Sequence, residues 1–546
     1  MEGHGPRPRP RHPTPRLPRR RDQPMDTADD RVVTLPELMN RQLDRHPDAV
    51  ALIVDGEQYL RYAEWDRRAE AVARTLLDRG VRPGDRVALL AAAPDWIEYA
   101  VAYLAAKKVA AATVHLSEAL VPAEIERRLA LCEVSGVLCT SGVTAPEQVR
   151  RPAGAWVATV GADDPEPAAG EPVRVTGDPD DLAEIIFTSG TTGDAKAIAV
   201  TTRMLTWGLD LEEDVVEIEG VAEMALYGNP IGSSPGMIVV MTPMVAHPPV
   251  ALAVTRHDPD FLGGLIERLR VQALYVPPAI AGRLADAAID ARHDLSSVVE
   301  FTTSSSALPV PVTARLAEMF PNATMNRAYV SLESVPAFTR ITTPPWATHP
   351  DRDYFQRPEA ASVGTPRFGA RVSIRDAEGK ELPPGQVGEI WLHTPAPQRR
   401  YYRSPEANAR TYVDGWVRMG DLGHVGEDGL LYVFDRVADA IPAATRLIST
   451  LPGEAALLRH PAVSEAAVFG TTDPVTGHQV PAAAVVLRSP ATDADLTAFA
   501  AGLLPPDEVP VVFHRLETLP RGTLGKVLKR ELRRRFPTAP LPVTAP

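Results

Sequence analysis

The chain has 546 residues, and its 57 lysines and arginines against 70 aspartates and glutamates give a net charge of −13. This length predicts two or three packed units, and the acidic balance argues against a protein that tracks nucleic acid. The two cysteines, Cys132 and Cys139, are too few for a disulfide framework, so we expect a reduced, cytoplasmic setting.

The N-terminal segment, residues 1–30, is rich in arginine and proline and holds almost nothing apolar. Such a segment cannot bury enough surface to offset the entropy of ordering it, so we predict a disordered extension. No apolar stretch follows Arg19, Arg20 and Arg21, which argues against a twin-arginine export signal.

Residues 35–175 alternate between helical and strand patterns, and the alternation resumes after a connection predicted over 152–182. Apolar spacing predicts helices over 65–79, 97–106 and 261–270 and strands over 86–90, 137–139 and 273–276. Strands that alternate with helices indicate βαβ units in mostly parallel sheets. The longest apolar stretch, residues 236–254, is interrupted by prolines and a histidine, so we expect a buried strand–loop–strand segment and no membrane span.

The last third of the chain changes character. Residues 360–438 show short strands separated by turns and predict a small β-rich subdomain. A further unit then begins, with a helix over 454–460, a strand over 465–469 and a basic helix over 525–536. We therefore predict an α/β chain with a large N-terminal domain over 31–438, a small α+β C-terminal domain over 439–536 and a flexible tail over 537–546.

The strongest motif follows a buried strand that ends at Phe187. It is a loop of hydroxyls and glycines closed by a lysine: Thr188, Ser189, Gly190, Thr191, Thr192, Gly193 and Lys196. Glycines let backbone N–H groups approach a phosphate chain, and the hydroxyls and the ammonium add donors and charge. The spacing of a Walker A loop is absent. The full string resembles the phosphate loop of the adenylate-forming superfamily, which includes acyl-CoA synthetases, nonribosomal adenylation domains and luciferases.

The resemblance extends over roughly residues 35–535, and it implies roles for further residues. The segment from Tyr329 to Glu333 resembles the family's Y-G-x-T-E, whose glutamate would hold Mg²⁺ against the phosphates of ATP. The segment 416–422 resembles W-x-R-T-G-D-L, whose aspartate, Asp421, would accept hydrogen bonds from both ribose hydroxyls. Ser305, Ser306 and Ala307 stand where the family packs a diglycine segment on adenine.

The resemblance also implies a mobile C-terminal domain. Arg436 would face the ribose and the phosphates, and Asp439 would be the pivot of the hinge between the domains. Residues 519–526 resemble the family's P-x-x-x-x-G-K loop, so the catalytic lysine falls on Lys526. We expect that replacing this lysine with alanine lowers the rate of adenylate formation about 10²–10³-fold.

The sequence departs from the family where a thiol acceptor would bind. Ala444 and Thr445 replace a glycine pair that admits the phosphopantetheine arm, and Glu508 replaces a lysine near the CoA phosphates. Leu332 replaces the threonine expected at the α-phosphate. The adenylation residues are better kept than the thiol-transfer residues, so CoA or phosphopantetheine as a second cofactor stays open.

The acid pocket is expected near Gly232, Ser233 and Ser234, which supply no charge and argue against an α-amino acid substrate. The sequence leaves three alternative functions open. The first is an ATP- and Mg²⁺-dependent, AMP-forming ligase that passes an acyl group from a carboxylic acid to CoA or to an acyl carrier protein. The second is an adenylating enzyme of specialised metabolism with a non-thiol acceptor, either an amine or nitrite in N–N bond formation. The third is a degenerate nucleotide-binding relic.

Overall fold

The computed structural model describes residues 32–161, 171–188, 195–207, 224–245, 250–304, 308, 310–367, 369–522 and 526–539. Residues 32–546 belong to one compact unit. The extension predicted over 1–30 and most of the tail predicted over 537–546 lie outside the described residues, so both stay predictions.

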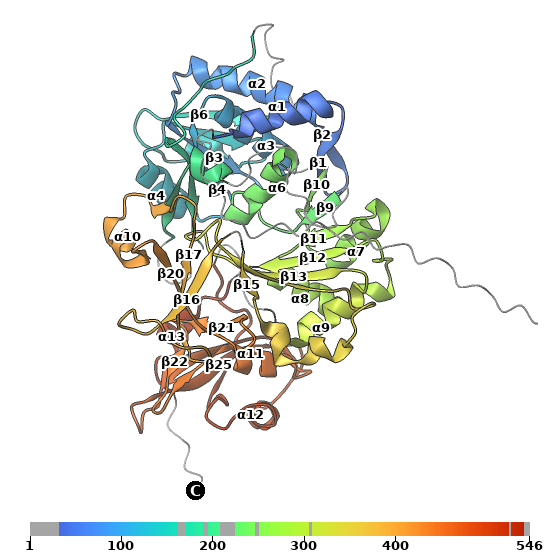
Figure 1. Ribbon diagram of the computed structural model, residues 1–546, viewed down its shortest axis with the longest axis vertical. Coiled ribbons are helices and arrows are strands. Elements are labelled where there is room, and N and C mark those ends of the chain that lie inside the picture. Colours follow the sequence, from blue (N-terminus) through green and yellow to red (C-terminus); the bar gives the residue numbers. More distant parts are fainter. Residues whose placement is uncertain are drawn as a thin grey trace, which may run out of the picture. The chain divides into compact units, whose positions relative to one another are not determined.

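One seven-stranded sheet carries the hairpin that flanks the predicted phosphate loop, in the order β18-β8-β7-β4-β3-β5-β6. Figure 1 labels β3, β4 and β6 of this sheet. Its strands are β3 (Arg86–Ala91), β4 (Ala112–Ser117), β5 (Gly136–Thr140), β6 (Trp156–Val160), β7 (Leu182–Phe187), β8 (Ala197–Thr201) and β18 (Arg400–Tyr401). The strands from β7 to β6 are parallel, whereas β8 and β18 are each antiparallel to their neighbour. The helices around this sheet are α2 (Tyr62–Asp78), α3 (Trp96–Lys108) and α4 (Pro122–Cys132).

A nine-stranded sheet has the order β15-β14-β13-β12-β11-β9-β10-β1-β2. Its strands are β1 (Val50–Val54), β2 (Gln58–Arg61), β9 (Met224–Tyr227), β10 (Val250–Ala253), β11 (Ala273–Tyr275), β12 (Glu300–Ser304), β13 (Thr324–Tyr329), β14 (Thr339–Thr343) and β15 (Thr365–Pro366). The six central strands are parallel, and antiparallel strands close both edges. The associated helices are α1 (Leu35–Arg45), α6 (Ser234–Val245), α7 (Pro259–Leu269), α8 (Pro278–Ala287) and α9 (Val310–Met319). The short helix α5 (Thr202–Thr206) instead contacts β7 and β8 of the seven-stranded sheet.

The predicted β-rich region is an antiparallel sheet of five strands. It contains β16 (Arg371–Arg375), β17 (Gly388–His393), β19 (Tyr412–Val413), β20 (Trp416–Val425) and β21 (Leu431–Arg436), with helix α10 (Pro405–Thr411) inserted before β19. The hairpin of β20 and β21 pairs two predicted site residues, Asp421 and Arg436.

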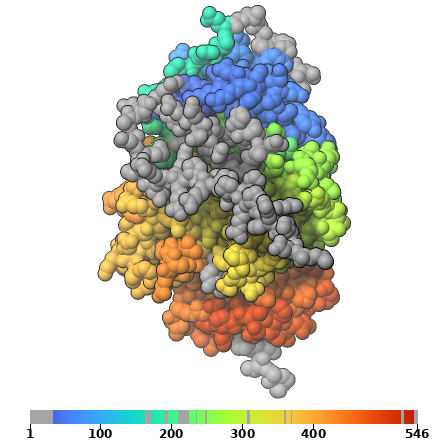
Figure 2. All heavy atoms as spheres, turned by 45° about the vertical axis from the view of Figure 1, so that its right-hand side comes forward, coloured from blue at the N-terminus to red at the C-terminus, as the bar shows by residue number. Residues whose placement is uncertain are grey.

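The C-terminal domain has hydrophobic clusters of its own, built from residues 441–536. In the space-filling view these residues gather in the orange and red part of the chain (Figure 2). The elements are β22 (Ile441–Pro442), β23 (Leu447–Ile448), α11 (Leu451–Leu458), β24 (Val463–Thr472), β25 (Gln479–Leu487), α12 (Asp493–Ala501), β26 (Phe513–Arg515) and α13 (Lys529–Arg535). The predicted α/β class, with parallel sheets and a separate small C-terminal domain, is confirmed.

Three local predictions are wrong. The segment 236–254 begins within the helix α6, which buries most of its apolar residues but leaves Ile238 half exposed, and Pro243 comes only two residues before its end. The predicted connection over 152–182 contains β6, which pairs with β5. The basic helix begins at Lys529 and not at 525, so Lys526 lies in the preceding loop. Within the described ranges, no helix has the length and hydropathy needed to cross a membrane.

Candidate active site

The two ends of the predicted phosphate loop are hydrogen-bonded to each other. The Thr188 amide donates to the Lys196 carbonyl at 2.9 Å, and the Lys196 amide donates to Thr188 Oγ1 at 3.1 Å. These bonds continue the β7–β8 hairpin, so both predicted residues stand where the chain leaves and re-enters the sheet. The predicted loop residues between them, Ser189, Gly190, Thr191, Thr192 and Gly193, lie outside the described residues, as do Ser305, Ser306 and Ala307.

Tyr401 joins the loop lysine to the predicted metal ligand. The Lys196 ammonium lies 4.6 Å from the centre of the Tyr401 ring, and the Tyr401 hydroxyl donates to Glu333 Oε1 at 2.8 Å. Burial and the Glu333 carboxylate raise the pKa of Tyr401, so the phenol stays a neutral donor at physiological pH. The sequence predicted Lys196 and Glu333 as site residues but assigned no role to Tyr401, which β18 brings beside β8.

Asp421 is held between two partners. The Tyr329 hydroxyl, at the end of β13, donates to Asp421 Oδ2 at 2.7 Å. Arg436 Nε lies 3.7 Å from Asp421 Oδ1, since the two residues face each other across the β20–β21 pair. Burial raises the pKa of Asp421, while Arg436, the Tyr329 hydroxyl and Lys526 oppose this increase. Tyr329 and Arg436, both predicted site residues, therefore lie beside the carboxylate of Asp421, a third predicted site residue.

Lys526 belongs to the same group of charges. Its loop is closed by hydrogen bonds from the Gly522 amide to the Lys526 carbonyl at 2.9 Å and from the Leu528 amide to the Pro520 carbonyl at 2.8 Å. Burial and the nearby Arg436 lower the pKa of Lys526 to about 8, and the carboxylates of Asp421 and Glu333 partly counteract this decrease. The structure thus brings the predicted catalytic lysine within electrostatic range of both predicted site carboxylates.

Comparison of the sequence with known protein families identifies the family of this chain. Residues 39–402 match the model of the AMP-binding enzyme family, and residues 453–526 match that of the AMP-binding enzyme C-terminal domain. This chain belongs to the AMP-binding enzyme family.

Relatives of this AMP-binding enzyme include several ligases. The chain is 29% identical over 505 residues to a feruloyl-CoA synthase from an Amycolatopsis species, covering 91% of this chain and 98% of the relative. It is 30% identical over 535 residues to the fatty acid–[acyl-carrier-protein] ligase ScoC of Streptomyces coeruleorubidus, covering 92% and 96%. Among solved structures, the amide bond synthetase McbA of Marinactinospora thermotolerans matches with a TM-score of 0.77 at 25% identity, covering 92% and 99%. The chain is therefore an adenylate-forming ligase by family.

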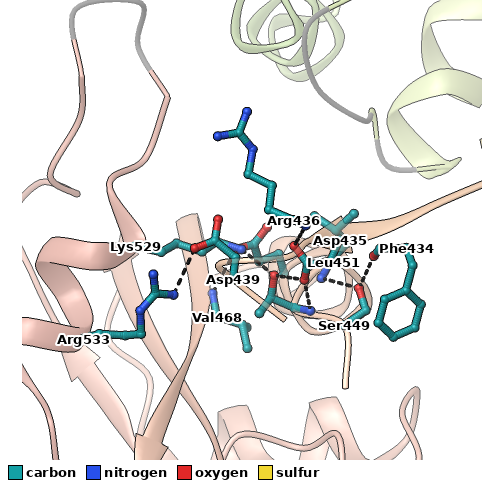
Figure 3. A network of polar contacts seen from close by, with 11 residues as sticks. Phe434, Asp435, Arg436, Asp439, Ser449, Leu451, Val468, Lys529 and Arg533 are labelled. Carbon is teal, nitrogen blue, oxygen red and sulfur yellow. Dashed lines mark hydrogen bonds and ion pairs between the residues drawn. The ribbon is translucent and has the colours of Figure 1, made fainter. Parts of the chain in front are cut away.

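The segment around the predicted hinge of the AMP-binding enzyme contains a dense polar network (Figure 3). Asp435 Oδ2 accepts hydrogen bonds from the amide and the hydroxyl of Thr450, both at 2.6 Å, and Oδ1 accepts from the Arg436 amide at 2.7 Å. Arg533 Nη1 donates to Asp439 Oδ1 at 2.9 Å. Asp439, the predicted hinge residue, is therefore tied to the C-terminal helix α13.

The predicted pocket residues have mainly structural contacts. Gly232 has a φ of +70°, and a Cβ atom at this position would lie 2.5 Å from the Leu116 carbonyl oxygen. The Ser233 hydroxyl donates to the Pro230 carbonyl at 2.5 Å and accepts from the Gly236 amide at 3.1 Å. Its described bonds thus fix the turn before α6. The side chain of Ser234 lies outside the described residues.

A buried arginine was missed by sequence reasoning. Arg399 is only 6% exposed, and its Nη1 donates to the Leu332 carbonyl at 3.2 Å, next to Glu333. Burial lowers the pKa of Arg399 to about 10, and Glu184, Tyr412 and Glu333 oppose the decrease. Glu184 is itself fully buried on β7, where it accepts from Tyr103 and lies 3.4 Å from Lys107 Nζ. No local pattern marks Arg399, because its partners lie far away in sequence.

Proposed function

We propose that this enzyme activates a carboxylic acid with ATP as an acyl-adenylate and passes the acyl group to a pantetheine thiol, either of CoA or of an acyl carrier protein. In the first step a carboxylate oxygen attacks the α-phosphorus in line. The bond to the bridging oxygen of the β-phosphate breaks, and pyrophosphate leaves. Positioning and charge neutralisation supply most of the catalysis in such a displacement.

The observation that carries the proposal is the convergence of Lys526, Glu333 and Asp421. Lys526 lies in electrostatic range of both carboxylates, so its ammonium can neutralise charge that develops on the phosphates. Asp421, oriented by Tyr329, would accept from the ribose hydroxyls. Glu333, oriented by Tyr401, offers the oxygen ligand that Mg²⁺ prefers, and the ion supplies further neutralisation of the phosphates when bound.

The names of the relatives suggest which acids to test. A feruloyl-CoA synthase and a fatty acid–[acyl-carrier-protein] ligase point to aryl and aliphatic carboxylates. The described pocket residues, Gly232 and Ser233, supply no charge for an α-amino group, so we do not expect amino acids to be activated.

Pyrophosphate release with ATP, Mg²⁺ and a panel of aryl, fatty and amino acids tests the proposal. We expect release with at least one aryl or fatty acid, and mass analysis then identifies the product formed with CoA or with a carrier protein. If no acid produces pyrophosphate while ATP still binds, the result contradicts the proposal and favours the nucleotide-binding relic.

A second candidate, an adenylating enzyme with an amine acceptor, is favoured by one specific observation. Arg446 lies two residues after Ala444, and its guanidinium pairs with Asp507 and Glu508, each at 2.8 Å. A turn tied to two carboxylates is poorly suited to the phosphates of CoA, and an amide bond synthetase is among the similar structures. An amide product with an amine, and no thioester with CoA or a carrier protein, would replace the first candidate with this one. Nitrite belongs in the same product assay.

A further inference from the structure

Two cationic side chains attach the short helix α13 to the predicted hinge residue Asp439 and to the segment 450–454. Lys529 Nζ donates to Thr450 Oγ1 at 2.5 Å and lies 2.7 Å from Glu454 Oε1. One turn later on the same helix, Arg533 binds Asp439 at 2.9 Å. Figure 3 shows both side chains reaching from α13 toward the segment that begins at Phe434.

These contacts form a continuous path between two cations of the candidate site, Arg436 and Lys526. The Thr450 hydroxyl accepts from Lys529 and donates to Asp435, and Asp435 also accepts from the amide of Arg436. Arg436 pairs with Asp421, and Lys526 precedes Lys529 by three residues. The path therefore connects the strand that carries Arg436 to the helix that follows Lys526.

The contacts of this path are shielded from water. Thr450 and Asp435 are buried, and the Lys529 side chain is only 10% exposed. Arg533 and Asp439 are 29% and 18% exposed. Removal of one partner of an ion pair in such surroundings strongly destabilises the folded protein, because the remaining charge is buried without an opposite charge. By contrast, Arg534 on the same helix is 79% exposed, and its partner among the described residues is its helical neighbour Glu531.

We infer that Lys529 and Arg533 are positioning residues that hold α13 on the hinge and thereby fix Lys526 opposite Glu333 and Asp421. Neither side chain touches the reacting atoms. Lys529 acts through Thr450 and Asp435, and Arg533 acts through Asp439. The catalytic consequence rests on the proposed function, but the placement of Lys526 can be measured without any substrate.

The test without substrate is deuterium labelling of the backbone amides of the Lys526 loop, followed by peptide mass spectrometry; the amides of Gly522 and Leu528 are hydrogen-bonded when the loop is closed. The variants are Arg533→Met and Lys529→Met, with Arg534→Met as the matched control on the same helix. We expect labelling of the Lys526 loop to become roughly tenfold faster in the first two variants, because local opening breaks these hydrogen bonds, and to stay at the wild-type rate in the control. Equal labelling in all three variants would overturn the inference.

The test with substrate uses the acid that gives the fastest pyrophosphate release. If Arg533 acts through Lys526, then Arg533→Met lowers kcat roughly tenfold in the wild-type background and has no further effect in the Lys526→Ala background. Full additivity of the two changes contradicts the inference. Arg533→Lys, which keeps a cation for Asp439, recovers part of the rate, and thermal melting of each variant identifies any that fail to fold.

The labelling and kinetic results separate the two levels of the argument. A wild-type protein that releases no pyrophosphate with any acid defeats the proposed function, yet the labelling of the Lys526 loop still decides whether α13 holds it in place. Conversely, an active wild type in which neither Arg533→Met nor Lys529→Met changes labelling or kcat leaves the proposed function intact and removes the positioning role.

Discussion

The replacement of Lys526 with alanine removes one positive charge from a site that already holds two carboxylates. An ammonium at ~4 Å from a developing charge contributes about 4 kcal/mol at an effective dielectric constant near 20. That energy corresponds to roughly a thousandfold in rate. The carboxylates of Glu333 and Asp421 partly neutralise the charge of Lys526, so less than the full effect is expected. We therefore expect Lys526→Ala to lower the rate of pyrophosphate release about 10²–10³-fold.

The pH dependence gives this prediction a second, independent measure. The pKa of Lys526 is lowered to about 8, so the side chain is charged below that pH and neutral above it. Because the charged form is the one that neutralises phosphate, kcat/KM for ATP falls as the pH rises through about 8 in the wild type. Bound phosphates favour the ammonium form, so the corresponding decrease in kcat appears at higher pH.

The assay is continuous detection of pyrophosphate from about pH 6 to pH 10, with wild type, Lys526→Ala and Lys526→Arg. Arginine stays charged throughout this range, so the activity of Lys526→Arg should show no decrease at alkaline pH. An alanine variant within about threefold of the wild type would refute the assignment of Lys526. So would an alanine variant that retains the alkaline decrease of the wild type.

Three further substitutions test other parts of the site. Tyr329→Phe removes the donor 2.7 Å from Asp421, a bond to a charged group worth about 1.5–3 kcal/mol, so KM for ATP should rise roughly tenfold or more; nucleotide affinity equal to wild type contradicts this. Gly232→Ala places a Cβ 2.5 Å from the Leu116 carbonyl at a φ of +70° and should lower the free energy of unfolding in urea by about 1–3 kcal/mol; an unchanged urea midpoint speaks against it. Arg399→Met removes the donor to the Leu332 carbonyl and a buried cation near Glu333, and should lower the free energy of unfolding by about 1–3 kcal/mol. A free energy of unfolding equal to that of the wild type would disprove this structural role of Arg399.

Much of the site could be predicted because its residues stand at fixed places in motifs. Asp421 and Arg436 lie far from Tyr329 in sequence, yet each falls in a short string with a characteristic neighbourhood, and the fold brings all three together. The alternation of helices and strands likewise predicted the parallel sheets, since each unit carries its own apolar period.

Other features could not be predicted, because long-range packing determines them. The uniformly apolar run in α6 fits a buried strand as well as a buried helix, and only its neighbours decide between them. Arg399 and Glu184 carry no motif, and their interaction depends on strands more than 200 residues apart in sequence. The loop around Lys526 was read as part of a helix because its basic residues continue into α13.

The pairing of β18 with β8 has a consequence for how the protein can be made. The outer edge of the phosphate-loop hairpin is covered by Arg400 and Tyr401, which leave the ribosome about 200 residues after Ala197. Until then the edge of β8 offers unpaired backbone groups to any other extended chain. A shortened version ending before residue 400 would carry that open edge permanently, so its expression should yield a self-associating product.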